Sequence, residues 1–406
     1  MQGSAKQRSV NAEGLDTAAF QSLLAFLPND LREFADTTLT KARELYECDR
    51  HYEVVAAVES VLERCKQTLQ TASLEDAPMQ ENIEPVSINS TSSTGTLPTT
   101  AVKPLPTALS VAIFHRFVES SLLYTFALNR IALCDSLTRE IEDDEGWKLV
   151  SDHGNGDGTY YRYDEANDAH FFKVRGTVQV SILYACSVIM ELDLFSEWFP
   201  SCRKSVSQGE VSRYYRSAYM LIGVPWPFSS REVLLLGAGI DDMEARNRIV
   251  IVAHSIPFAG MEPRKFVASD ATPGACTLNE PGVVLPGINV PAHNNSNVVC
   301  DIIYTGFEVK MRTPTETQLS FILSIDPKVP NIPRGVLNWL SGKVMWGMLG
   351  DMEAAAKKAM QRGSKYHKRR CERPDVYDLL RKRYNDVLKS KYTQDDYVKY
   401  ALKADY

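Results

Sequence analysis

The sequence lacks the features that mark a membrane-spanning, a secreted or a metal-binding protein. It has no run of about 18 apolar residues, so a membrane-spanning helix is not expected. Residues 1–16 lack the apolar core of a secretory signal, and none of the eight cysteines belongs to a Cys-x-x-Cys pair. We therefore expect a cytoplasmic protein with reduced thiols and no metal site.

Catalytic and nucleotide-binding motifs are also missing. The chain contains no Gly-x-Ser-x-Gly elbow, no His-Glu-x-x-His, no P-loop and no dinucleotide fingerprint. Asp241 and Asp242 are adjacent, so on a strand they point to opposite faces and cannot act together as acid and base. We expect no enzymatic activity and no cofactor.

The overall charge argues against nucleic-acid binding. The formal net charge is −6 and the isoelectric point about 5.8, which exclude a global basic field. The charge is unevenly placed, because residues 361–406 hold 13 Lys and Arg against 7 Asp and Glu. The C-terminal tail is thus basic on an acidic body.

The chain is long enough for more than one folding unit. Its 406 residues are 44% hydrophobic and 24% charged, as in a globular protein with a full core. Apolar residues at helical spacing predict a helical hairpin over residues 1–70, turning near 48–51. A Ser/Thr/Pro-rich stretch, residues 71–107, predicts a flexible linker.

A long amphipathic helix is expected over residues 108–145. Its apolar stripe can pack against the domain that follows or form a dimer contact, and the sequence leaves both open. From residue 146 to 360 the pattern changes to strands, with one helix inserted early and one long helix beginning at Pro333. This order predicts an α+β fold in which a curved antiparallel sheet surrounds the C-terminal helix and leaves a cavity.

Three segments in this region resemble the START family, the steroidogenic-acute-regulatory-protein-related lipid-transfer domains. They are DLFSEWFP at 193–200, VPWPFSSREVLLL at 224–236 and ILSIDPKVPNIP at 322–333, in the family's order and spacing. The resemblance spans roughly residues 147–360. In sterol-binding members an arginine stands six residues after the one that matches Arg231, and here that position is Gly237.

The resemblance implies a START-like helix-grip fold that binds one lipid in a hydrophobic cavity and transfers it, with peripheral contact to membranes. The last helix would act as a gate, because four glycines at 335, 342, 347 and 350 interrupt its apolar stripe. Close packing of these glycines on the sheet is the alternative explanation. A second functional hypothesis is a lipid-sensing adaptor whose N-terminal helices bind a protein partner, and a more remote one is a helix-grip enzyme.

Strand alternation gives the candidate residues of the cavity. We predict that the lining includes Tyr219, Leu221, Arg231, Ile303, Phe307, Val309, Leu319, Phe321, Leu323, Trp339, Val344 and Met348. Ordinary core packing is the alternative for each of them. Arg231 can contact a lipid headgroup or pair locally.

The basic tail, residues 361–406, has two explanations. Lys365, Lys368, Arg369 and Arg370 are candidates for docking to an anionic membrane surface, where each basic residue adds about 1 kcal/mol. Alternatively the tail is helical, and its apolar residues pack back on the domain.

Overall fold

The computed structural model describes residues 17–48, 50–75, 107–224, 226–262, 287–328, 335, 337 and 339–402. The chain forms two compact units, one within residues 1–48 and 52–128 and the other from residues 49–51 and 129–406. Most of the expected linker, residues 71–107, lies outside the described residues.

The first unit is helical. It contains α1 (Thr17–Leu24), α2 (Asn29–Glu47), most of α3 (His51–Glu75) and α4 (Thr107–Glu119). Each of the three longer helices buries one stripe at three- and four-residue spacing, as the periodicity predicts. The buried stripes are Leu31, Ala35, Leu39 and Ala42 on α2, Val54, Val58, Val61 and Cys65 on α3, and Val111, Phe114 and Val118 on α4.

The expected single helix over residues 108–145 is in fact two helices. α4 ends at Glu119, and α5 (Leu122–Glu142) begins after Ser120 and Ser121. The Ser120 hydroxyl donates to the Arg116 carbonyl at 2.8 Å, and that of Ser121 donates to the Val118 carbonyl at 2.7 Å. Serine hydroxyls that compete for backbone carbonyls in this way favour a helix end over a helix interior.

The second unit is built on one large sheet. Its strands among the described residues are β1 (Lys148–Gly154), β2 (Asp157–Asp164), β3 (Ala169–Val178), β4 (Cys202–Ser212), β5 (Tyr215–Ile222), β6 (Arg231–Asp242), β7 (Arg248–Ser255), β8 (Val298–Val299), β9 (Asp301–Thr313) and β10 (Glu316–Asp326). The order is β1-β2-β3-β10-β9-β7-β6-β5-β4, antiparallel throughout, while the short β8 pairs with β6 in parallel. The predicted antiparallel sheet is confirmed.

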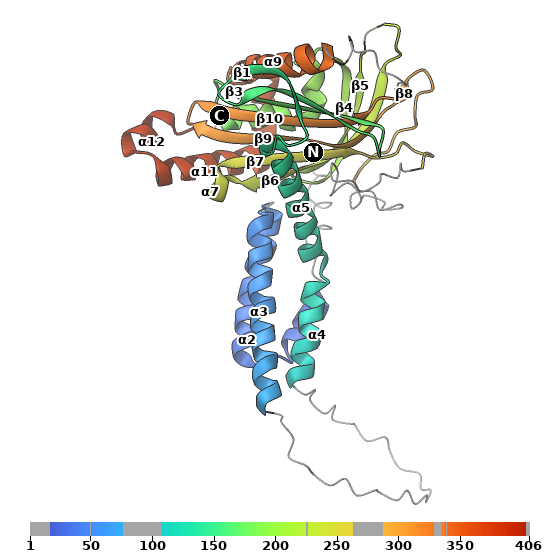
Figure 1. Cartoon of the computed structure of the whole chain (residues 1–406). Helices are drawn as coiled ribbons and strands as arrows, with labels where there is room; N and C mark the ends of the chain where they lie inside the picture. Colours follow the sequence, from blue (N-terminus) through green and yellow to red (C-terminus); the bar gives the residue numbers. More distant parts are fainter. Residues whose placement is uncertain are drawn as a thin grey trace, which may run out of the picture. The chain divides into compact units, whose positions relative to one another are not determined.

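Helices cover one face of this sheet. α6 (Ile182–Met190) and the 3-10 turn η2 (Leu192–Glu197) form the early insertion, and a π-helical segment η4 (Trp339–Val344) leads into α9 (Met345–Ala359). Figure 1 shows α9 along the sheet. It approaches closely at Gly176 of β3, where a Cβ atom would lie 2.5 Å from a methyl group of Leu349.

The other face of β3 holds the end of α5. The buried Lys173 ammonium donates to the carbonyls of Glu140 and Asp143 at 2.8 and 2.7 Å and pairs with Asp144 at 2.7 Å. Phe172, its neighbour on the strand, points to the helix-covered face. Alternation on β3 therefore separates the two faces of the sheet.

The C-terminal tail is helical, and its apolar side packs back on the domain. It forms α10 (Lys365–Glu372), α11 (Pro374–Lys391) and α12 (Gln394–Tyr400), and a short helix α7 (Met243–Arg246) follows β6. Val376, Leu380, Tyr384 and Leu388 of α11 are buried in the same core as α6 and α9. This is the second of the two explanations for the tail.

A buried carboxylate attaches these C-terminal helices to the domain. Glu191, which follows α6, has no exposed surface and accepts a hydrogen bond from the Tyr377 hydroxyl at 2.6 Å. Arg373 lies 3.1 Å and Arg369 3.3 Å from its two oxygens, and Arg216 of β5 approaches to 3.8 Å. Burial and the Glu191 charge raise the pKa of Tyr377 well above its usual value.

Candidate functional site

A cavity of about 220 Å³ lies between the sheet and the helices that cover it. An apolar cavity of roughly 150 Å³ already stays dry and takes up a small apolar molecule. The lining comes from five groups: His170 and Phe172 of β3; Ile189, Leu192, Phe195, Phe199 and Ser201 of the α6–η2 insertion; Met220, Ile222, Gly223, Val224, Phe228, Arg231, Val233, Leu235, Ile251 and Ala253 of β5–β7; Cys300, Ile302, Thr305, Gly306, Phe307, Phe321, Leu323, Ile325 and Pro327 of β9–β10; and Leu337, Leu340, Val344, Met345 and Met348 of the last helix.

Six predicted residues lie in this lining. They are Arg231, Phe307, Phe321, Leu323, Val344 and Met348. Phe307 and Phe321 are directly paired across β9 and β10, and their ring centroids are 4.4 Å apart. The structure brings these six side chains together around one cavity.

On β5 the two predicted residues, Tyr219 and Leu221, do not line the cavity. Met220 and Ile222 line the cavity, so their neighbours Tyr219 and Leu221 point to the opposite face. The pairing with β6 explains this, because Met220 lies opposite Val233 and Ile222 opposite Arg231.

A bulge explains a similar displacement on β9. Between the pairs Leu323–Thr305 and Ile325–Ile302, β10 advances by two residues and β9 by three. The extra residue reverses the alternation, so that Thr305 and Ile302 both line the cavity and Ile303 does not.

Three further predicted residues lie elsewhere. Val309 and Leu319 are paired on the expected face but are fully buried in the core, where α6 and α9 pack on the sheet. Trp339 begins the π-helical segment, and its side chain lies outside the described residues.

The sequence reasoning missed most of the lining from β6 and the α6–η2 insertion. Val233 and Leu235 follow Arg231 at a spacing of two, so alternation from Arg231 alone could have found them. Phe195, which lies within the quoted DLFSEWFP segment, lines the cavity as well.

Arg231 is a buried cation in the cavity wall, with 4% of its surface exposed. Its Nε donates to the Pro327 carbonyl at 2.7 Å, and Nη1 donates to the Ser229 carbonyl. Among the described residues, no carboxylate lies within ion-pair distance of it. Burial lowers the pKa of Arg231.

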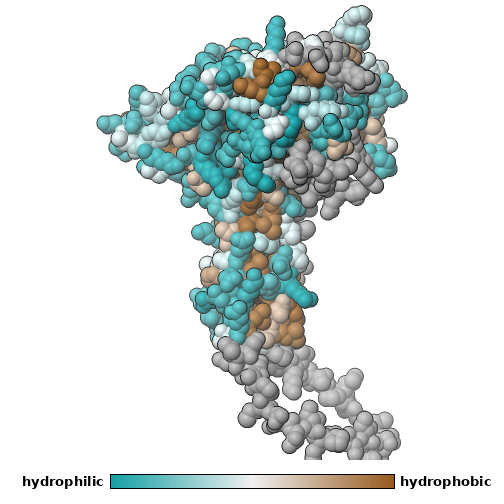
Figure 2. All heavy atoms as spheres, viewed as in Figure 1, coloured by the Kyte–Doolittle hydropathy of each residue, from teal (hydrophilic) through white to brown (hydrophobic). Residues whose placement is uncertain are grey.

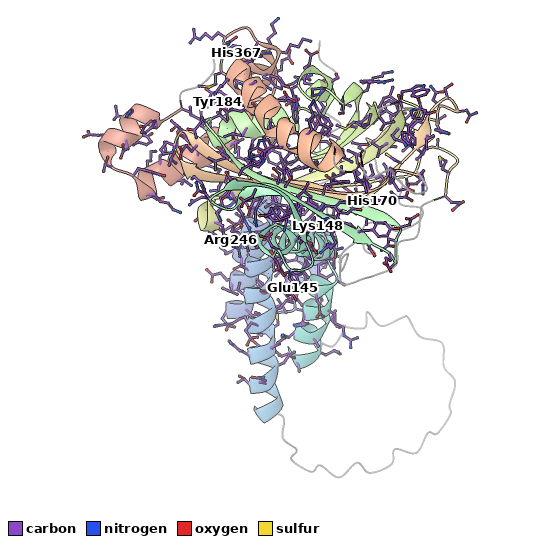
Figure 3. All side chains as sticks on the ribbon, turned by 45° about the horizontal axis from the view of Figure 1, so that its top comes forward. Glu145, Lys148, His170, Tyr184, Arg246 and His367 are labelled. Carbon is purple, nitrogen blue, oxygen red and sulfur yellow. The ribbon has the colours of Figure 1, made fainter. Side chains whose placement is uncertain are left out.

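His170 and Cys300 are the other titratable groups of the lining. The Nδ1 atom of His170, a residue labelled in Figure 3, lies 2.9 Å from the Tyr161 hydroxyl. Burial lowers the pKa of His170, which favours the neutral ring, and raises the pKa of the Cys300 thiol to about 12. The thiol is therefore protonated at neutral pH, and it is a poor nucleophile.

Glu232, the residue after Arg231, points to the opposite face of the sheet and organises the loop before β8. It accepts hydrogen bonds from the Tyr219 hydroxyl and the Asn294 amide, both at 3.0 Å, and also contacts His293 and Asn297. Burial and the bond to Glu232 raise the pKa of Tyr219 to about 12. Glu232 is thus fully engaged away from the cavity.

The basic residues predicted to dock to membranes are mostly engaged within the protein. Lys365 pairs with Glu197 at 2.6 Å, and Arg369 with Asp193 at 2.6 Å. Arg370 is buried, with its guanidinium 5.0 Å from the ring centroid of Tyr184, also labelled in Figure 3. Lys368 is exposed.

No helix among the described residues is long and apolar enough to cross a bilayer. Nor do the described ranges contain a group of three or more His, Cys, Asp or Glu side chains placed to hold a metal ion.

Comparison with known proteins finds similarity only at the level of solved structures. No protein-family model matches the chain, and no curated protein matches it. The matching structures include human STARD10, with 16% identity and a TM-score of 0.44 over 62% of this chain and 86% of that one. Human StAR-related lipid transfer protein 5 has 13% identity and a TM-score of 0.44, and the match covers 58% of this chain and 97% of that one. The Zhui aromatase/cyclase from Streptomyces sp. R1128 has 11% identity and a TM-score of 0.30, and the match covers 48% of this chain and 98% of that one.

This chain has a START-like fold. Its long antiparallel sheet, with α9 packed along it and α6 inserted after β3, is the helix-grip arrangement. The α+β helix-grip fold predicted from the sequence is confirmed by this topology.

Proposed function

We propose that residues 146–360 bind one lipid molecule in the cavity and carry it between membranes. The observation that supports this most directly is the cavity itself, whose walls are Phe, Leu, Ile, Val and Met side chains from both the sheet and the helices. Apolar walls of this kind are typical of sites that remove an apolar ligand from water.

Transfer of a lipid through water is slow because its tail is costly to hydrate. Each CH₂ group contributes about 0.8 kcal/mol, so a tail of roughly 16 carbons meets a barrier on the order of 12 kcal/mol. A carrier lowers this barrier if it offers the tail comparable apolar surface. The lining of this cavity is suited to that role.

The last helix is the proposed gate. Leu340 and Val344 of its π-helical segment line the cavity, and so does Met348 of α9. π-Helical turns are rare in proteins, and those that occur are often found at functional sites. A Cβ atom on Gly342, Gly347 or Gly350 would meet no described atom within 4 Å, so close packing does not explain these glycines. Their effect is to weaken the helix that covers the cavity.

The proposed membrane contact lies on the loop between β5 and β6. Trp226 is 92% exposed, while Val224 and Phe228 of the same loop line the cavity. Tryptophan is favoured at membrane–water interfaces. A lipid that enters beside this loop would pass directly from the bilayer to the cavity wall.

We propose carriage rather than chemistry. The described lining contains no carboxylate, its thiol is protonated, and its single histidine is bonded to a tyrosine outside the lining. A nucleophile with an adjacent base, the usual arrangement for covalent catalysis, is not found among these residues.

A cavity-filling variant tests the proposal. Leu323→Trp places a bulky ring in the lining, and we expect vesicle-to-vesicle lipid transfer to fall at least tenfold, as an occupied cavity cannot take the tail. The matched control is Leu221→Trp, on the opposite face of the same sheet, which should retain transfer. Equal transfer by both variants, with equal melting temperatures, would contradict a role for the cavity.

A second candidate function, the lipid-sensing adaptor, is favoured by the surface of the first unit. Leu109 and Ile113, one turn apart on α4, are 47% and 39% exposed. Figure 2 shows hydrophobic patches over these N-terminal helices. Carriage predicts that one protein molecule moves many lipids between vesicles. The adaptor predicts lipid-dependent binding of a protein partner with little transfer, which Leu109→Glu would abolish.

A further inference from the structure

The polar side chains of the cavity gather at one end of it. His170 lies opposite Ile325 in the β3–β10 pairing, and Arg231 donates to the carbonyl of Pro327. Ile325 and Pro327 both line the cavity at the end of β10. The remainder of the lining is almost entirely apolar, so the cavity has one polar end.

No side chain among the described residues balances the charge of Arg231. Two backbone carbonyls accept hydrogen bonds from its Nε and Nη1, but carbonyls carry no net charge. Glu232 points to the other face of β6, and the described part of the lining contains no Asp or Glu. A buried cation in this state is unfavourable until an anion joins it.

His170 is placed to donate a second hydrogen bond. Burial keeps its ring neutral, and the Tyr161 hydroxyl contacts Nδ1. When that hydroxyl donates, the ring proton is on Nε2. Within the described residues Nε2 has no hydrogen-bond partner, and the side chain lines the cavity.

We propose that Arg231 and His170 recognise an anionic oxygen head, a carboxylate or a phosphate, so that the carried lipid is an anionic amphiphile. This inference rests on the proposed function, since it names the headgroup of the lipid held in the same cavity. A lipid ammonium would find no carboxylate among the described lining residues, and a neutral lipid would leave Arg231 uncompensated. The competing explanation is that Arg231 only ties β6 to the end of β10.

Binding of paired probes distinguishes these explanations. We would compare a pyrene-labelled fatty acid, ionised at the assay pH, with its methyl ester, and lysophosphatidic acid with a monoacylglycerol of the same chain. The acid should bind about tenfold more tightly than the ester, the ratio expected from one charge-assisted hydrogen bond. A preference in only one pair identifies the head as carboxylate or phosphate.

Substitutions assign the preference to the two residues. Arg231→Met should reduce binding of the acid to the level of the ester, while Arg231→Lys should keep part of the preference. Ester binding by Arg231→Met reports that the cavity is intact. If that variant does not fold, the test is the ratio of acid binding to ester binding in the wild-type protein and in His170→Phe, which should show a smaller preference for the acid.

Equal affinity of the wild-type protein for acid and ester in both pairs would overturn the inference and leave the proposed function standing. So would an unchanged preference in folded Arg231→Met. Failure of all four probes to bind would instead contradict the lipid cavity itself.

Discussion

Stiffening the last helix should slow lipid transfer without reducing the capacity to bind lipid. Gly347 and Gly350 of α9 are exposed, have ordinary helical backbone angles, and have open space where a methyl group would be added. Replacing each by alanine stabilises a helix by about 0.8–1.0 kcal/mol. The double variant therefore favours the closed helix by about 2 kcal/mol, which lowers the open population up to roughly thirtyfold.

The assay is transfer of a fluorescent lipid between vesicles, with bound lipid at equilibrium measured separately. Ser60→Ala is the matched control, because it raises helix propensity at an exposed position of α3, far along the chain from the gate. We expect the glycine variant to melt higher, transfer lipid at least fivefold more slowly and bind the same amount. A higher melting temperature with unchanged transfer would refute the claim that this helix opens.

Two further predictions concern stability. Glu191→Ala leaves the buried Tyr377 hydroxyl without its acceptor and removes the nearest carboxylate of Arg373, and it should reduce the free energy of unfolding by about 1–3 kcal/mol in urea. Glu197→Ala, which breaks an exposed pair, should change it by under about 1 kcal/mol, and equal losses would contradict the role of the buried carboxylate. Burial, aided by the Arg130 charge, lowers the pKa of His254 from 6.5 to about 3. Below pH 6.5 the unfolded chain takes up this proton and the folded chain does not, so His254 lowers stability by about 1.4 kcal/mol per pH unit until the pH approaches 3. His51, whose pKa burial also lowers to about 3, adds a second slope of this size. His254→Leu should reduce the measured slope by about 1.4 kcal/mol per pH unit in urea titrations at a series of acidic pH values, and an unchanged slope would contradict the lowered pKa of His254.

The cavity lining could be predicted where one strand's alternation was sufficient. Phe307, Phe321 and Leu323 were found because β9 and β10 are long and regular and pair in register over most of their length. On β5 the same rule gives two equally good sets, Tyr219 with Leu221 or Met220 with Ile222. The choice depends on the pairing with β6, which no local pattern contains.

Other differences come from interactions between distant segments. The bulge that turns Ile303 away involves a mismatch between two strands, and the burial of Val309 and Leu319 depends on how α6 and α9 pack over them. The basic tail shows the same limit, because the partners of Lys365 and Arg369 lie more than 160 residues earlier in the chain. The helix end at Ser120 and Ser121 depends on hydrogen bonds between residues three or four apart, so it is easier to predict from the sequence.

Native mass spectrometry of the purified full chain tests the central claim most directly. Lipid carriage predicts a population heavier by the mass of one lipid, an adduct that Leu323→Trp lacks and Leu221→Trp keeps. A protein that carries no lipid after purification, and acquires none after incubation with anionic phospholipid vesicles, would contradict the proposal that this cavity holds a lipid.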